Sequence, residues 1–107
     1  MHIKPNLQRG TNDTINFMNQ NLSEEDIIIS NIKHLYWTVL EYYFPNNTIH
    51  NSETFDYINN ENIIWLFEDD ENEINKENIT DLGYNIQKVY VGSIDTMYDF
   101  SIYKLTK

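Results

Sequence analysis

The side chains best suited to chemistry in this sequence are the carboxylates of one dense run. Five of the six residues from 68 to 73 are acidic, namely Glu68, Asp69, Asp70, Glu71 and Glu73. Such a run could bind calcium, take part in acid–base catalysis or attract a basic partner. Each use demands a different pattern in the surrounding residues.

A calcium-binding loop does not fit the run in either register. The loop needs oxygen ligands at its first, third and fifth positions, glycine at the sixth and glutamate at the twelfth. With Asp69 in the first position, Ile74 is sixth and Thr80 is twelfth. With Asp70 in the first position, Ile74 is fifth and Asp81 is twelfth. The sequence therefore predicts no specific calcium site.

The patterns of the other common chemistries are also missing. A catalytic pair of carboxylates needs one member whose pKa is raised by burial, and adjacent residues of a polar run are poor candidates. The histidines, His2, His34 and His50, are not spaced to share a zinc ion. The chain has no cysteine, and its three glycines are isolated instead of grouped in a phosphate-binding loop. We expect no enzyme activity, no metal and no cofactor.

The negative charge is concentrated in the middle of the chain. The net charge of the 107 residues is −10. Between positions 34 and 87, eleven carboxylates oppose one lysine, Lys76, whereas the two flanks hold six acidic and six basic residues and cancel. A lone charged run is usually a solvated loop, but a charge of this size costs stability through self-repulsion. We therefore favour a binding role, and direct contact with nucleic acid is disfavoured because phosphates are also negative.

Aromatic residues adjoin this charge in the sequence. Trp37 and Tyr42 fall off the apolar stripe of the helix expected there, so they are either exposed or packed under the edge of the sheet. Exposed aromatics beside charge have the composition of a protein-binding hot spot. The predicted partner-binding residues are Glu68, Asp69, Asp70, Glu71, Glu73, Asp56, Glu53, Trp37 and Tyr42.

Composition predicts one folded domain over residues 1–107, with 1–10 as a loosely ordered lead-in. A chain with 40% hydrophobic and 14% aromatic residues is too apolar to be disordered. The longest apolar run, 63–67, is far shorter than the about 20 residues that span a bilayer. The first residues lack the apolar core of a signal peptide. We expect a cytoplasmic protein with no membrane partner.

Periodicity predicts two helices in the first half of the chain. Capping residues at 11–14, followed by apolar residues at helical spacing up to Leu22, predict a short first helix. The sequence from Ser23 to Asp26 has the form of a capping box, and an apolar stripe follows it to Tyr43. A second, long helix is therefore predicted from residue 23 until Pro45 stops it.

After Pro45 the pattern changes to that of strands. Residues 54–58 and 62–67 predict a hairpin with a turn at 59–60, and the second of these strands is expected in the centre of the sheet. A short helix over 53–59 is the alternative to its first strand.

The rest of the chain predicts a short helix over 75–82, closed by Gly83, and two last strands over 85–91 and 98–105 with a turn at 92–96. The predicted fold class is α+β. Two N-terminal helices pack on a mostly antiparallel sheet of about four strands, with one short inserted helix.

In general character the chain resembles the immunity proteins of bacterial contact-dependent growth inhibition and related polymorphic-toxin systems. The resemblance covers the whole chain, and it rests on the anionic stretch 53–81, the adjacent aromatics and the order of helices then sheet. No residue motif defines these families, so no residue roles are carried over. The resemblance implies a protein that covers the active-site cleft of a cognate basic toxin domain, a nuclease or RNase, with an acidic face. The alternative is a phage- or plasmid-encoded nucleic-acid mimic that inhibits a host DNA-binding enzyme.

Overall fold

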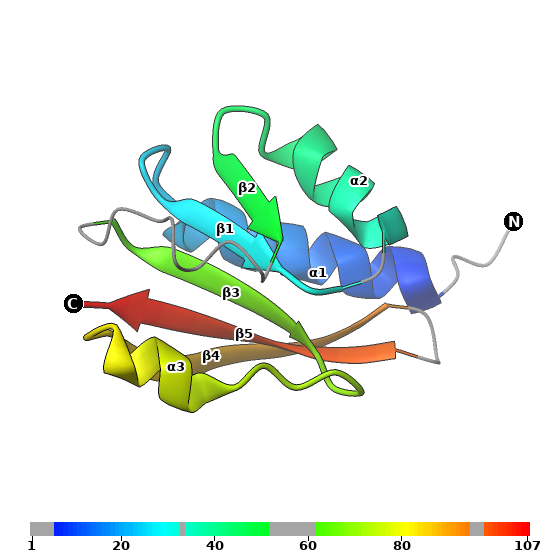
Figure 1. Ribbon diagram of the computed structural model, residues 1–107. Coiled ribbons are helices and arrows are strands. Elements are labelled where there is room, and N and C mark those ends of the chain that lie inside the picture. The colour runs from blue at the N-terminus through cyan, green and yellow to red at the C-terminus, as the bar shows by residue number, and fades with distance from the viewer. Residues whose placement is uncertain (1–5, 33, 52–61, 95–97) are drawn as a thin grey trace, which may run out of the picture.

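The computed structural model describes residues 6–32, 34–51, 62–94 and 98–107 (Figure 1). The elements in these ranges are, in chain order, α1 (Asn6–Asn21), β1 (Ile27–Ser30), α2 (His34–Tyr43), β2 (Thr48–Asn51), β3 (Ile64–Asp69), α3 (Lys76–Asp81), β4 (Asn85–Ile94) and β5 (Tyr98–Thr106). The fold class is α+β, as predicted. Within the described ranges it has three helices and five strands, one strand more than expected.

The described strands form one sheet in the order β2-β1-β3-β5-β4. β1 pairs in parallel with β2 and with β3, whereas β5 pairs antiparallel with β3 and with β4. β3 is the central strand and is buried along its whole length, which confirms the prediction from the apolar run. The sheet is mixed and not mostly antiparallel, because α2 connects β1 to β2 as the crossover that parallel strands require.

The largest difference from the predicted fold lies between residues 23 and 33. The predicted long helix is wrong here, because residues Ile27–Ser30 form β1 and α2 begins only at His34. Three consecutive β-branched isoleucines favour a strand once they have strands on both sides. The carboxylate of Asp26 does accept a hydrogen bond from the backbone N–H of Ser23 at 3.0 Å, as in a capping box, but the chain continues as a strand.

The first helix also begins earlier than predicted. α1 starts at Asn6, so residues 6–10 belong to this helix and not to the predicted lead-in. Thr14, one of the predicted capping residues, is buried within α1, and its hydroxyl donates a hydrogen bond to the Tyr90 hydroxyl of β4 at 3.3 Å. The polar residues at 11–14 therefore lie within the helix and do not start it.

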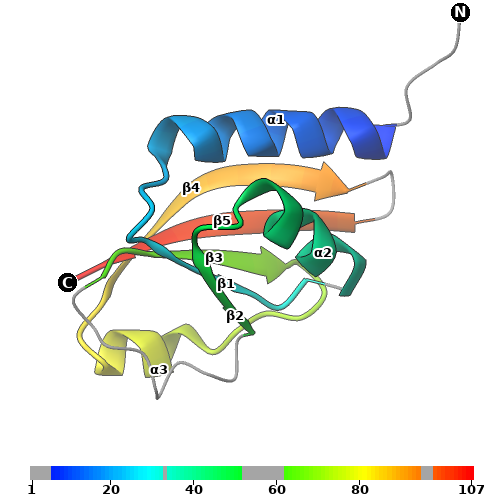
Figure 2. The same ribbon diagram turned by 90° about the horizontal axis from the view of Figure 1, so that it is seen from above.

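Helices cover both faces of the sheet (Figures 1 and 2). On one face Met18 of α1, Leu40 of α2 and Phe44, which follows α2, lie in a core that includes Trp65 and Phe67 of β3. On the other face Ile79 of α3 packs in a second core, whose members from the sheet are Ile29, Ile64, Leu66, Tyr103 and Leu105. Because successive side chains of a strand point to opposite faces of the sheet, the strands contribute residues to both cores.

Aromatic rings dominate the core under α1. Phe17 stacks on Tyr90 at a centroid distance of 4.7 Å and meets the Trp65 ring edge-on at 6.3 Å. Gly92 pairs with Phe100 across β4 and β5. A Cβ atom at position 92 would lie 2.7 Å from the Phe100 ring and 2.8 Å from the Tyr90 ring. Because glycine has no Cβ, the two rings can occupy this space.

The second half of the chain follows the prediction closely. The predicted helix over 75–82 is α3: Asn75 caps it by accepting a hydrogen bond from the Glu77 N–H, and Gly83 ends it with a φ of +96°. The two last strands are confirmed as β4 and β5, although β4 continues to Ile94, so Gly92 lies in a strand and not in the turn. The predicted strand 54–58, its helical alternative and the turn 59–60 lie outside the described residues.

Candidate protein-binding surface

The acidic run begins inside the sheet. Glu68 and Asp69 are the last residues of β3 and are only 2% and 3% exposed. One carboxylate oxygen of Glu68 accepts hydrogen bonds from Lys76 Nζ at 2.6 Å and from the Ile74 N–H at 2.8 Å. The run is therefore not a solvated loop from its start, because the charges of these two residues serve the fold.

Asp69 and Asn31 hold the turn that follows β3. The Asp69 carboxylate accepts a hydrogen bond from the Glu71 N–H at 2.9 Å, and its own N–H donates to the Asn31 side-chain oxygen at 2.7 Å. The Asn31 amide group donates to the carbonyl of Asn72. The Asp70 N–H donates to the carbonyl of Asp99 at 3.1 Å, which joins the same turn to β5. The turn is thus held at several points.

The exposed carboxylates lie beyond these anchors, on the continuous segment from the end of β3 to the end of α3. We call the set of Asp70, Glu71, Glu73, Glu77 and Asp81 the acidic surface; all five side chains are exposed. The segment runs along one border of the molecule, on the α3 side of the sheet (Figures 1 and 2). None of the five forms an ion pair with a described residue.

Two features of α3 add to this negative potential. Glu77 and Asp81 are four residues apart, so their side chains share one side of the helix and repel each other. Asp81 also lies at the negative end of the helix dipole, where an acidic residue is unfavourable, and the last turn holds no basic residue. These local costs are not offset by any described ion pair. The segment therefore keeps its charge at some expense of stability.

Lys76, the single lysine of the acidic stretch, is partly buried and pairs with the buried Glu68. Burial alone would lower its pKa, but the hydrogen bond from its ammonium to Glu68 and the charge of that carboxylate outweigh burial and raise the pKa above 10.5. The Nζ atom also lies 4.9 Å from the centre of the Tyr103 ring, with Lys88 at 5.6 Å from the same ring. Lys76 therefore forms its ion pair with Glu68, and its charge also interacts with that of Glu73 at longer range.

The remaining predicted binding residues divide into three cases. Tyr42 is 77% exposed and meets the Tyr43 ring edge-on at 5.0 Å, so of the two alternatives left open it is exposed. Trp37 lies in α2, but its side chain is outside the described part of the structure. Glu53 and Asp56 are outside the described residues altogether.

Charge and aromatics, adjacent in the sequence, are separated by the sheet. α2, which carries Tyr42, packs with Leu40 and Phe44 on the face that α1 also covers. α3 packs with Ile79 on the opposite face. A single flat partner surface therefore cannot contact Tyr42 and α3 together. These residues are close in the sequence, but they do not form one hot spot in the fold.

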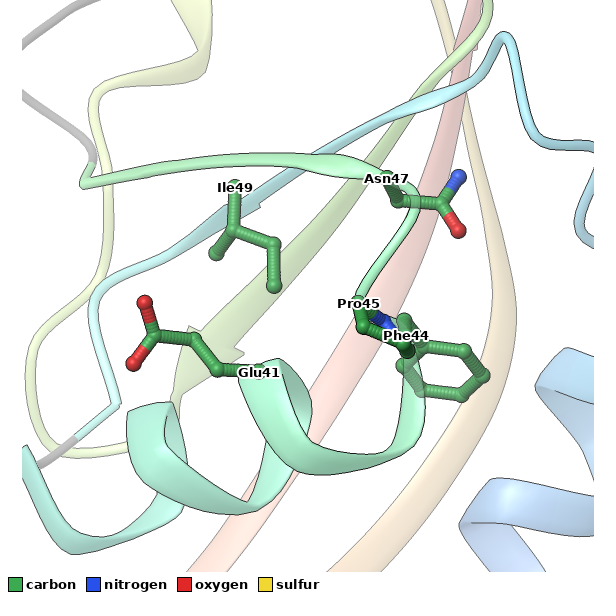
Figure 3. Close-up of a pocket in the computed structure, with 5 residues that line it drawn as sticks. All are labelled: Glu41, Phe44, Pro45, Asn47 and Ile49. Atoms are coloured by element: carbon green, nitrogen blue, oxygen red, sulfur yellow. The ribbon is translucent and has the colours of Figure 1, made fainter.

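A small hollow lies between the end of α2 and β2 (Figure 3). Its volume is about 260 Å³, and its lining residues are Glu41, Phe44, Pro45, Asn47 and Ile49. The Asn47 amide turns away from it (Figure 3) and donates hydrogen bonds to the carbonyls of Ser23, Glu24 and Asp26, which holds the start of β2 in place. No local pattern in the sequence predicts this hollow, because the approach of α2 to β2 depends on the unexpected strand β1.

The described residues show no arrangement for metal chemistry. They contain no group of three or more histidine, cysteine or carboxylate side chains that could hold a metal ion. His50 is half-buried on β2, and Asp26 uses its carboxylate to accept the indole N–H of Trp65 at 2.9 Å. The described ranges include no helix of the length and apolarity needed to cross a membrane.

Comparison with known proteins was negative throughout. No family model matches the chain, and neither a search of curated proteins nor a search of solved structures found a match. The charges and contacts described above are therefore the basis for assigning a function.

Proposed function

We propose that this chain binds a basic protein partner through the acidic surface. Its biological role in this proposal is that of an immunity protein of a polymorphic-toxin system, acting in the cytoplasm without catalytic activity of its own. The cognate toxin domain is a nuclease or RNase, and the acidic surface covers its active-site cleft.

The observation that carries the proposal is that the five exposed carboxylates lie on a segment with well-fixed ends. Glu68 and Asp69 bind the N-terminal end through Lys76 and through the turn, and Asn75 and Gly83 define the two ends of α3. A loop that only confers solubility needs no such anchors. Charges held in place lose less conformational entropy on binding, which is the advantage of a preorganised interface.

The mechanism follows from electrostatics. A nuclease cleft is basic because it must hold phosphates, and carboxylates held along a folded segment can occupy the positions of those phosphates. Attraction between opposite charges steers the encounter and raises the association rate toward about 10⁸–10⁹ M⁻¹s⁻¹ at low salt. Since screening lengths shrink as salt rises, binding should weaken with ionic strength.

The test compares two triple variants that remove the same number of charges. Glu71, Glu73 and Glu77 are changed to Gln in the first, and Asp13, Glu24 and Glu25 to their amides in the second; all six side chains are exposed. Each variant is co-expressed with the protein encoded immediately upstream, and the affinity of the purified complex is measured over a range of salt concentrations.

The first variant should lose at least about tenfold in affinity together with most of its salt dependence, since each close charge pair at an interface contributes on the order of 1.5 kcal/mol or more. The second should lose much less. Equal losses would mean that only net charge matters and would refute the acidic surface as the interface. If the upstream product does not bind and a host DNA-binding enzyme is captured instead, the nucleic-acid mimic becomes the better description.

A further inference from the structure

The hollow between α2 and β2 is lined by three apolar residues, one amide and one carboxylate. Phe44 is buried, Ile49 is half-buried and Pro45 is exposed. Glu41 is exposed, and its carboxylate lies on the same side as the Ile49 side chain, which reaches from β2 toward α2 (Figure 3). At about 260 Å³ the hollow is smaller than the roughly 300–1,000 Å³ of small-molecule sites. It has the size for one side chain.

The hollow is also a place of negative potential. Glu41 stands in the last turn of α2, where the helix dipole is already negative, and this turn contains no basic residue. Glu41 forms no ion pair with a described residue. A cation entering the hollow would therefore meet a carboxylate and the end of a helix, both uncompensated by the described part of the chain.

A carboxylate beside apolar residues favours a particular cation. Arginine combines a planar charged head, which pairs with a carboxylate through two hydrogen bonds, with an apolar stem that can lie on aliphatic and aromatic surface.

We propose that this hollow binds an arginine side chain of a protein partner, with the stem against Phe44, Pro45 and Ile49 and the guanidinium at Glu41. This rests on the proposed function, because the same basic partner supplies the arginine. The hollow lies on the other side of the sheet from the acidic surface. The arginine therefore belongs to a segment of the partner that extends beyond the main interface.

The test uses the full chain labelled with ¹⁵N and the capped tripeptide Gly-Arg-Gly as probe. Amide shifts of Tyr43, Asn47 and Ile49 are followed by NMR during titration to millimolar peptide. The matched peptides contain citrulline, which is neutral but nearly the same shape, or lysine. We expect saturable shifts at these amides, with arginine stronger than lysine and lysine stronger than citrulline.

Two variants with one charge removed complete the test. Glu41→Gln should weaken arginine binding at these amides roughly two- to fivefold, the range of an exposed ion pair, whereas Glu71→Gln on the acidic surface should leave it unchanged. Equal shifts from citrulline and arginine, or shifts confined to α3, would overturn the proposal, as would the absence of saturation.

Failure here is distinguishable from failure of the proposed function. If neutralising Glu71, Glu73 and Glu77 weakens the toxin complex but Glu41→Gln does not, the acidic surface is supported as the interface and the arginine site is refuted. If the tripeptide binds at the hollow but no upstream protein is bound, the arginine site is supported and the immunity role is refuted.

Discussion

Replacing Glu68 by glutamine separates the structural part of the acidic run from its exposed part. Glutamine has the shape of glutamate, but it carries no charge to pair with Lys76. In the native protein one oxygen of Glu68 accepts hydrogen bonds from Lys76 Nζ at 2.6 Å and from the Ile74 N–H at 2.8 Å. The substitution therefore weakens two hydrogen bonds at the point where the segment leaves the sheet, and it leaves a partly buried ammonium without its counter-ion.

The magnitude can be worked out from burial. Hydrogen bonds to charged groups contribute about 1.5–3 kcal/mol and neutral ones about 1 kcal/mol. Removing one partner of a fully buried ion pair costs about 3–5 kcal/mol, but the Lys76 side chain is 31% exposed and water compensates part of that loss. We expect Glu68→Gln to lower the free energy of unfolding by about 2 kcal/mol.

The measurement is urea denaturation followed by circular dichroism. With a slope of about 1–3 kcal/mol per molar urea, the midpoint should fall by about 1 M. The control, Glu71→Gln, also removes one charge of the run but from an exposed position, and it should stay within about 0.5 kcal/mol of the native chain. If the two variants are equally stable, the assignment of Glu68 as an anchor is refuted. In a Lys76→Met background the cost of Glu68→Gln should shrink, because the pair is already broken.

Two further predictions concern Gly92 and Tyr84. Gly92→Ala places a Cβ 2.7 Å from the Phe100 ring, so it should destabilise the folded protein by about 1–3 kcal/mol in thermal melts. Gly→Ala in a strand usually stabilises, and such a gain here would refute the close packing at position 92. The buried Tyr84 hydroxyl has no hydrogen-bond partner among the residues that the structure describes, so Tyr84→Phe should stabilise by about 1 kcal/mol in urea denaturation, whereas exposed Tyr42→Phe should change nothing. Burial raises the pKa of Tyr84 above 10.0, and the hydrogen bond and charge of Glu68 raise that of Lys76 above 10.5. The unfolded chain therefore loses these protons at lower pH than the folded chain, and the free energy of unfolding should fall as pH rises from these values through the higher folded ones. Tyr84→Phe should remove the tyrosine part of this loss.

The second half of the fold was predictable because its signals are local. The apolar run at 63–67 predicted the central strand, and Asn75 and Gly83 marked the two ends of α3. The first half was not, because its outcome depends on distant partners. Ile27–Ser30 satisfies a helical spacing as well as a strand, and the decision comes from pairing with β2 and β3, which no local pattern displays.

The candidate site shows the same division. The exposure of Asp70, Glu71 and Glu73 was predictable from polarity alone. The burial of Glu68 was not, although a signal existed. Glu68 falls on the same face of β3 as Leu66 and Ile64, two and four residues before it, and Lys76 is the single cation nearby in the sequence. The separation of Tyr42 from the acidic residues required knowledge of which face each helix covers.

The contact between α1 and β4 has a consequence for how the protein reaches its native state. Phe17 stacks on Tyr90, and Thr14 donates a hydrogen bond to the same tyrosine, although Thr14 and Tyr90 are 76 positions apart. On the ribosome α1 therefore emerges long before the strand that covers its apolar side. Until β4 and β5 are made, that side is exposed to other chains and to chaperones, so the nascent protein is most prone to aggregate before its last hairpin has been synthesised.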